Sequence, residues 1–504
     1  MGIVARQSLK SSLATYLGIA IGFVTTFFVL TDCLSTEEIG LTRVLVDAAT
    51  LFAAFAQLGT NASIIKYFPY FKDSAGNKAF GGLIIIFPLL GFTILTFVLL
   101  LFRGEIVDIY SVRSPLIREY FMLLIPLSFF TLYVSVFETS ANALMRITVP
   151  RVIRDVVIRV LNLVCYLLYG HHIISFDVFV ILFTASWGLA MLLNLCYLLS
   201  MKQVSFRFDF KSLDRRNLNG MLRYSLFMTL IVFASYSQLF GSLFIGAKEG
   251  LALAGVYTIA FYIANIVDVP YKSLGSISRP IVATASKNGD SNELSSIAQN
   301  VALHQFLASA LLLFFIWVNL DALFAVIPHG EDFVAGKWVV LILGIEKVVN
   351  CTFSVSIDIL NYSKYYRISL FFVLLLSITT LALNGWFVTI WGINGAAAAI
   401  LLSFTIYYTG LLIYIRWKLK VSTFSYAQVK VGLVILLLLV FNQMWSFAVT
   451  PYLHDELPLV ITDALIKSLI LTVLAAVALY KFHVSPHVNS LLDRLTHIFH
   501  KDSN

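Results

Sequence analysis

Long apolar runs dominate the pattern of hydrophobic and polar positions along this chain. Each run is followed by a break that carries charged, proline or glycine residues. A helix rises about 1.5 Å per residue, so about twenty apolar residues cross the ~30 Å hydrocarbon layer of a membrane. The runs have this length and lack the roughly ten-residue alternating segments of a membrane barrel. The pattern therefore predicts an all-α integral membrane protein with about fourteen transmembrane helices, near residues 12–34, 41–65, 80–102, 118–140, 150–169, 176–199, 222–246, 251–273, 298–319, 334–358, 366–386, 393–415, 428–449 and 462–481.

The composition agrees with this class. Of the 504 residues, 59% are hydrophobic and 12% are charged, whereas soluble domains carry roughly 25% charged residues. The first run follows Arg6 and Lys10, continues past signal-peptide length and has no A-x-A cleavage pattern. We therefore expect it to be the first span, with nothing removed.

Basic residues gather in alternate breaks between the runs. Most of the 35 Lys and Arg fall on the side that holds both ends of the chain, and acidic residues gather on the other side. The positive-inside rule then predicts that both termini are cytoplasmic. The net charge of +8 is explained by this orientation, so we predict no nucleic-acid partner. Arg159, Lys347 and Lys467 fall inside predicted spans instead.

The spans divide into two sets of six. A long polar linker, residues 201–223, separates an N-lobe at 1–200 from a C-lobe at 224–420. Equal, even span counts predict lobes related by a pseudo-two-fold axis along the membrane normal. The last two spans form an appendage at 421–482, and an amphipathic helix on the inner leaflet is predicted in the tail at 483–504.

Residue spacing gives no sign of a metal, cofactor or catalytic site. The four cysteines are scattered, and the pair His171 and His172 has no neighbouring acid or thiol. The breaks on the outer side are short, and no Walker motif or Asp-x-Asp pair is present. We therefore predict no metal, no cofactor, no catalytic residue and no enzyme.

The stretch from Glu37 to Lys72 combines an acidic start, an apolar run and a basic, aromatic exit. Arg43 and Asp47 lie four residues apart on one face of this predicted helix, so they should face protein or water rather than lipid.

Three features carry a resemblance to a known family. They are the fourteen spans, the opening SLKSSLATYLGIAIGFVTTFFV and the segment STEEIGLTRVLVDAATLFAAFAQLGTNASIIKYFPYF. In these features the chain resembles the polysaccharide flippases of the multidrug/oligosaccharidyl-lipid/polysaccharide (MOP) exporter superfamily. Ile39 stands where an aromatic residue is commoner in that family.

This resemblance implies a transporter of the bacterial inner (plasma) membrane that serves surface polysaccharide biosynthesis, such as O-antigen or lipopolysaccharide. It would move an undecaprenyl-pyrophosphate-linked oligosaccharide from the cytoplasmic to the periplasmic leaflet by alternating access. The last two spans would border a groove for the polyprenyl tail. Membrane lipids, a coupling ion (Na⁺ or H⁺), a polysaccharide polymerase and glycosyltransferases are the implied partners.

An anionic, hydroxyl-rich cargo needs fixed positive charge and hydrogen-bonding groups along its path. The candidate substrate-binding residues are Arg43, Arg159, Lys347, Asn142 and Asn350. The alternative is structural pairing within the chain. In that case Arg43 would pair with Asp47, Arg159 with Asp155, and Lys347 with Glu346.

The candidates for coupling or gating are acids within or at the ends of spans, because a buried carboxyl group can bind a proton or a cation. They are Asp47, Glu138, Asp155, Asp268 and Glu346. We expect Glu138 and Asp155 to close an inner gate with Arg159, or simply to neutralise it. Asp268 precedes Pro270 and could instead serve a helix kink.

Three other functions remain as alternatives. A multidrug cation antiporter of the same superfamily should have an acid-rich, cation-poor interior, so the sign of the buried charge separates it from a flippase. A lipid II flippase has similar electrostatics, and a membrane polysaccharide polymerase or ligase is a more distant alternative.

Overall fold

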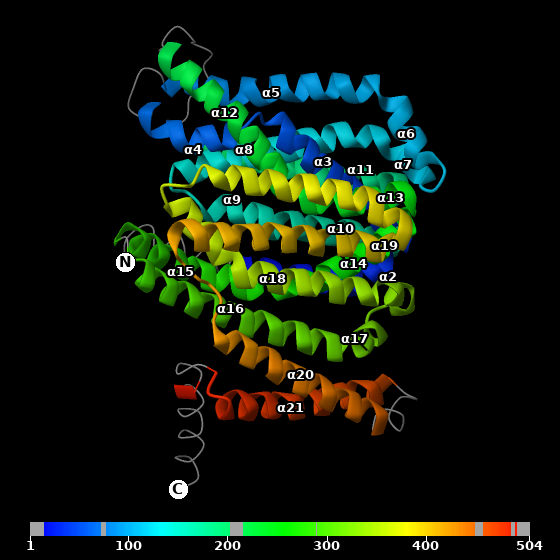
Figure 1. Cartoon of the computed structure of the whole chain (residues 1–504). Helices are drawn as coiled ribbons and strands as arrows, with labels where there is room; N and C mark the ends of the chain where they lie inside the picture. Colours follow the sequence, from blue (N-terminus) through cyan, green and yellow to red (C-terminus); the bar gives the residue numbers. More distant parts are fainter. Residues whose placement is uncertain are drawn as a thin grey trace. The chain divides into compact units, whose positions relative to one another are not determined.

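The structure, a computed structural model, describes residues 15–71, 77–201, 215–288, 290–448, 457–484 and 489–490. All regular secondary structure within these ranges is helical (Figure 1). Most of the linker at 201–223 and nearly all of the tail predicted to be amphipathic lie outside the described residues.

The helices follow the apolar runs. Eleven described helices are long and apolar enough to cross a membrane, and the bent pair Asn219–Val232 and Ser237–Lys248 makes a twelfth if it crosses as one span. The chain is therefore a multi-pass, all-α membrane protein.

Two further predicted crossings lie in helical segments that are not separate long helices. α19 (Ile368–Leu419) has 52 residues and is broken at Gly392, where φ is 54° and ψ is −131°. Because one crossing takes about twenty residues, we interpret α19 as the two spans predicted at 366–386 and 393–415. The span predicted at 150–169 lies on α9 (Thr148–Val152), the π-helix η3 (Ile153–Val157) and α10 (Ile158–Gly170).

Backbone contacts divide the chain into two compact units. Unit 1 comprises Met1–Ile259 with Ser377–Ala396, and unit 2 comprises Ala260–Leu376 with Ala397–Asn504. These units are defined by contacts, whereas the lobes at 1–200 and 224–420 are defined by span counts and stay a prediction.

Unit 1 begins with a helical segment, Thr15–Cys33. Its packed centre is formed by α3 (Thr36–Ala56) and α4 (Thr60–Phe71) against α8 (Leu124–Ala143), and by α8 against α11 (Phe176–Ser200). The other helices of this unit include α5 (Asn77–Leu101), α6 (Arg103–Ser111), α7 (Pro115–Tyr120), α12 (Arg215–Ser235), α13 (Phe240–Lys248) and α14 (Leu251–Asn265), which runs into unit 2.

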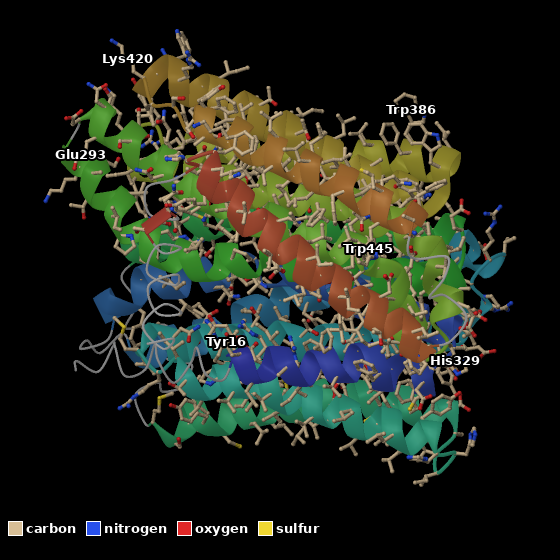
Figure 2. All side chains as sticks on the ribbon, turned by 90° about the horizontal axis from the view of Figure 1, so that it is seen from below. Tyr16, Glu293, His329, Trp386, Lys420 and Trp445 are labelled. Carbon is tan, nitrogen blue, oxygen red and sulfur yellow. The ribbon has the colours of Figure 1, made fainter. Side chains whose placement is uncertain are left out.

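Unit 2 is built on α16 packed against α18 and α15. α20 and α21 lie side by side in Figure 1, and their buried residues form one apolar cluster with α16. In Figure 2, Glu293 and Lys420 lie at one end of this unit and His329 lies at the other. Its elements are η6 (Ile266–Asp268), α15 (Val269–Asn288), α16 (Ser291–Val318), α17 (Leu320–Val326), η7 (Gly330–Gly336), α18 (Lys337–Tyr362), α20 (Tyr426–Ala448) and α21 (Leu457–Lys481).

The acidic start of α3, next to Ser35, has a local structural role. The Ser35 side chain accepts a hydrogen bond from the Glu38 backbone N–H, and the Glu38 carboxylate accepts one from the Ser35 backbone N–H. This reciprocal pair is a capping box, which satisfies donors that the first turn of a helix leaves open. The start of α3, and hence the positions of Arg43 and Asp47 along it, is fixed by these residues.

Candidate functional site

Arg43 and Asp47 form a buried ion pair on α3. Arg43 Nε lies 2.6 Å from Asp47 Oδ2, and the Ser242 hydroxyl of α13 donates to the same oxygen at 2.5 Å. Asp47 is only 4% exposed. The predicted pairing is confirmed, and Ser242 adds a neutral donor that no local spacing predicts, because it lies 195 residues away. A charge buried in this way needs such partners to offset its lost hydration.

Next to this pair, α3 and α14 cross backbone to backbone. A Cβ at Gly40 would overlap the Leu251 carbonyl, and a Cβ at Gly255 would overlap the Thr36 carbonyl. Each glycine therefore lies against the residue four positions before the other. The contact is reciprocal, as expected around a local two-fold axis, and only residues without a side chain allow it.

The connection from α6 to α7 is bonded to α13. The Tyr110 hydroxyl donates to Leu243 O at 3.1 Å, the Ser114 hydroxyl donates to Gly246 O at 2.7 Å, and Arg113 donates to Lys248 O. Burial raises the pKa of Tyr110 to about 12, so its hydroxyl remains a donor at physiological pH. These bonds tie the carbonyls at the end of α13 to a segment more than 130 residues earlier.

A second charged cluster of unit 1 involves α8 and η3. Arg154 lies 2.8 Å from Glu138 and 3.1 Å from Asp155, and the Thr15 hydroxyl donates to Asp155 at 3.0 Å. The structure thus brings Glu138 and Asp155 together, as expected. The cation between them is Arg154, which was not among the candidate residues predicted from the sequence. No local pattern reveals this contact, since sixteen residues separate Arg154 from Glu138.

The pairing predicted for Arg159 is wrong. Its guanidinium donates to the Gly18 backbone carbonyl on the first helix, and within the described residues it makes no ion pair with Asp155 or any other acid. A Cβ at Gly22 would occupy the space that the guanidinium fills. Gly18 and Gly22 form a G-x-x-x-G pattern, which permits close helix packing, and this spacing was the available signal for a neighbour of Arg159.

Unit 2 holds a third charged cluster, in which Lys347 lies between two acids. Its Nζ is 3.2 Å from Glu346 Oε2 and 3.5 Å from Asp268 Oδ2, and it lies 5.6 Å from the centre of the Phe261 ring. Lys347 is 2% exposed and Glu346 is 0% exposed. The predicted contact with Glu346 is confirmed, and Asp268 joins it from η6, the 3-10 turn between α14 and α15. One ammonium against two carboxylates gives the cluster a formal charge of −1.

The two candidate amides have different surroundings. Asn350 accepts a hydrogen bond from the Tyr408 hydroxyl at 2.7 Å, which fixes its side chain within unit 2. The buried Oδ1 of Asn142, at the end of α8, receives no hydrogen bond from any described residue. Of the two, Asn142 therefore keeps an unused acceptor for a ligand.

Comparison with known proteins places this chain in a family. Residues 4–283, more than half of the chain, match a family model described as "Polysaccharide biosynthesis protein". This chain belongs to the polysaccharide biosynthesis protein family. No curated relative matches the sequence.

Solved structures show which fold this polysaccharide biosynthesis protein has. The lipid II flippase MurJ, in an inward closed conformation, matches with a TM-score of 0.71 at 13% identity, over 94% of this chain and 99% of that one. An inward-facing MATE multidrug resistance transporter of the MOP superfamily matches at 0.61 and 14% identity, over 81% and 98%. A MOP superfamily transporter from Pyrococcus furiosus matches at 0.56 and 14% identity, over 83% and 96%. The fold is therefore that of MOP transporters and flippases, as predicted.

Proposed function

We propose that this protein is a flippase for an undecaprenyl-pyrophosphate-linked oligosaccharide, moving it from the cytoplasmic to the periplasmic leaflet of a bacterial inner membrane by alternating access. Both termini would be cytoplasmic, and glycosyltransferases and a polymerase would act before and after it. The family and the fold support the class of transporter, and the buried charges support the class of cargo.

The observation that carries the cargo is the charge of the inner cluster of unit 1. Arg154 pairs with Glu138 and Asp155, Arg151 donates to the Thr15 hydroxyl that bonds Asp155, and Arg159 nearby has no carboxylate partner among the described residues. A positive surplus inside the membrane stabilises an anion such as a pyrophosphate and repels a cationic drug. This favours the flippase over the multidrug cation antiporter.

The contacts around α3 support an alternating mechanism. Ser242 with Asp47, and Gly255 with Gly40, join segments assigned to different predicted lobes, on the predicted outer side. A passage that opens outward must separate these segments. We assign Asp47 a gating role on this basis, since its bond to Ser242 would be broken and re-formed in each cycle.

The cluster around Lys347 suits ion coupling. Its formal charge of −1 in a buried site favours binding of a proton or a small cation such as Na⁺. We propose that Asp268 and Glu346 bind the coupling ion and that Lys347 modulates its affinity. This role takes Lys347 out of the direct substrate path, where Arg43, Arg159, Asn142 and Asn350 remain the candidates.

The experiment that tests the cargo is a comparison of three variants in cells whose surface polysaccharide depends on this protein. We expect Arg159→Gln to reduce surface polysaccharide at least about tenfold, since one charge-assisted contact is worth about 1.5–3 kcal/mol. Arg159→Lys should retain part of it, and Arg118→Gln, on the short helix α7, should match wild type. In cells with Arg159→Gln, lipid-linked oligosaccharide should accumulate in the inner leaflet.

Normal polymer from Arg159→Gln at wild-type protein level would remove this residue from the substrate path. Translocation of lipid II in place of the oligosaccharide in proteoliposomes would favour the lipid II flippase. Polymer growth catalysed by the purified protein would favour a polymerase or ligase.

A further inference from the structure

A polar cavity of about 210 Å³ lies within unit 2, at the end that carries α17 and η7. The end of α16 and the starts of α17 and α18 line one part of it, and α20 and α21 line the rest. Figure 2 shows this region on the His329 side of the unit, with Trp445 on the neighbouring helix α20. None of the residues considered for the flippase site takes part.

Two ionisable residues on α21 face this cavity although they are nine-tenths buried. Asp463 is 6% exposed and Lys467 is 7% exposed. They are four residues apart but are held by different neighbours: Trp445 Nε1 donates to Asp463 Oδ1 at 2.8 Å, and Lys467 Nζ donates to Val318 O at 2.8 Å. Ionisable groups within a membrane segment are costly and mark a functional site by default.

Capping of α16 explains only part of this arrangement. Val318 is the last residue of α16, and an ammonium group near a helix C-terminus is stabilising. That role uses one of the three N–H donors of Lys467. It accounts neither for Asp463 nor for the open volume beside both residues.

The rest of the lining is polar and electrically balanced. At the mouth, Lys337 Nζ bonds both oxygens of Asp321, at 2.6 and 2.8 Å. The two lysines and two aspartates of the lining sum to zero formal charge. Asn442 also lines the cavity, and its buried Oδ1 receives no hydrogen bond from the described residues. An acceptor in such a position indicates a missing donor.

We propose that this cavity binds the head group of a zwitterionic phospholipid, with its phosphate at Lys467 and its ammonium at Asp463. A balanced lining disfavours a ligand of either net sign and fits one that carries both charges. The volume is below the ~300–1,000 Å³ of pockets for drug-sized ligands, so it holds a head group without its chains. Exposed apolar residues of α20 and α21, among them Leu436, Met444 and Leu469, offer a surface for the acyl chains.

Binding can be measured on the purified full-length protein by native mass spectrometry with added lipid. We expect phosphatidylethanolamine to bind at least about fivefold more tightly than phosphatidylglycerol, which lacks the ammonium group. Lys467→Gln and Asp463→Asn should each weaken phosphatidylethanolamine binding about tenfold, the size of one lost charge-assisted hydrogen bond. Lys481→Gln, an exposed lysine at the other end of the same helix, should leave it unchanged.

Thermal melting of each variant establishes that it is folded, and the selectivity of the wild-type protein tests the proposal without any variant. Equal binding of the two phospholipids by the wild-type protein would overturn the proposal. Phosphatidylethanolamine binding that is not weakened tenfold in either variant would overturn it as well. Tighter binding of undecaprenyl diphosphate, weakened by Lys467→Gln but not by Asp463→Asn, would make the cavity an anion site and would also overturn it. None of these measurements depends on the proposed transport activity.

Discussion

The Asp47 carboxylate is bonded by Arg43 of its own helix α3 and by Ser242 of α13, so a substitution of Arg43 affects stability as well as any contact with cargo. Removal of Arg43 alone leaves a buried charge with only the Ser242 hydroxyl in place of an ion pair. We expect Arg43→Ala to lower the free energy of unfolding by about 3 kcal/mol, the cost of breaking a buried pair. Thermal melting in detergent would measure this loss.

The double variant Arg43→Ala/Asp47→Ala separates folding from cargo binding. Because it removes both charges, it should recover most of the lost stability. If Arg43 also contacts the cargo, surface polysaccharide stays low in the stable double variant. Recovery of both stability and polymer would show that the pair is only structural.

Glu346 offers the sharpest residue-scale test of coupling. Glu346→Gln keeps the shape of the side chain but leaves Lys347 with Asp268 alone, so the cluster becomes neutral. We expect transport in proteoliposomes to lose its response to an imposed proton or sodium gradient while exchange without a gradient continues. Asp358→Asn, on the same helix and paired with Arg279 outside this cluster, is the matched control. An undiminished response in Glu346→Gln would exclude this residue from coupling.

At the scale of elements, the crossing of α3 and α14 depends on two glycines. Gly40→Val places a side chain where the Leu251 carbonyl lies, so it should force the helices apart. We expect a cysteine at Ser242, in a variant without the four native cysteines, to react about tenfold faster with an impermeant thiol reagent added outside. Gly104→Val is the control, because a Cβ there would meet no atom within 4 Å. Equal labelling of the two valine variants would contradict a gate at this crossing.

The sequence correctly predicted ion pairs only where both partners lie on one helix. Arg43 with Asp47 and Glu346 with Lys347 follow from spacing on α3 and α18 alone. The Arg159 prediction failed because Arg154 and Thr15 bond the Asp155 carboxylate, while the Arg159 guanidinium donates to the Gly18 carbonyl.

Contacts between helices had no comparable signal. Arg154 with Glu138, Asp268 with Lys347 and Ser242 with Asp47 depend on how spans pack, and nearly every span here is apolar around much of its surface. Hydropathy therefore located the helices but could not assign their faces. The Arg43 and Asp47 spacing indicated one packed face, and the G-x-x-x-G spacing of Gly18 and Gly22 is a signal for another.

At the scale of the whole molecule, the fourteen-span order predicts on which side of the membrane each connection lies. Lys420 and His329 lie at opposite ends of unit 2 (Figure 2). We expect alkaline phosphatase fused after His329 to be active and the same enzyme fused after Lys420 to be inactive, because the phosphatase requires the outer compartment. Fluorescent-protein fusions at the same two sites should give the reverse pattern. Activity of both phosphatase fusions would contradict the three spans that are predicted between these two sites.

The placement of opposite charges along the chain also constrains synthesis. Arg43 and Asp47 lie on the same helix, so these two charges can neutralise each other as soon as α3 leaves the ribosome, without waiting for another segment. The ammonium nearest Asp268 belongs to α18, which emerges some eighty residues later. Until α18 has been delivered, Asp268 therefore lacks the ammonium that it pairs with in the folded protein. A pause in translation between these segments would lengthen the exposure of that carboxylate.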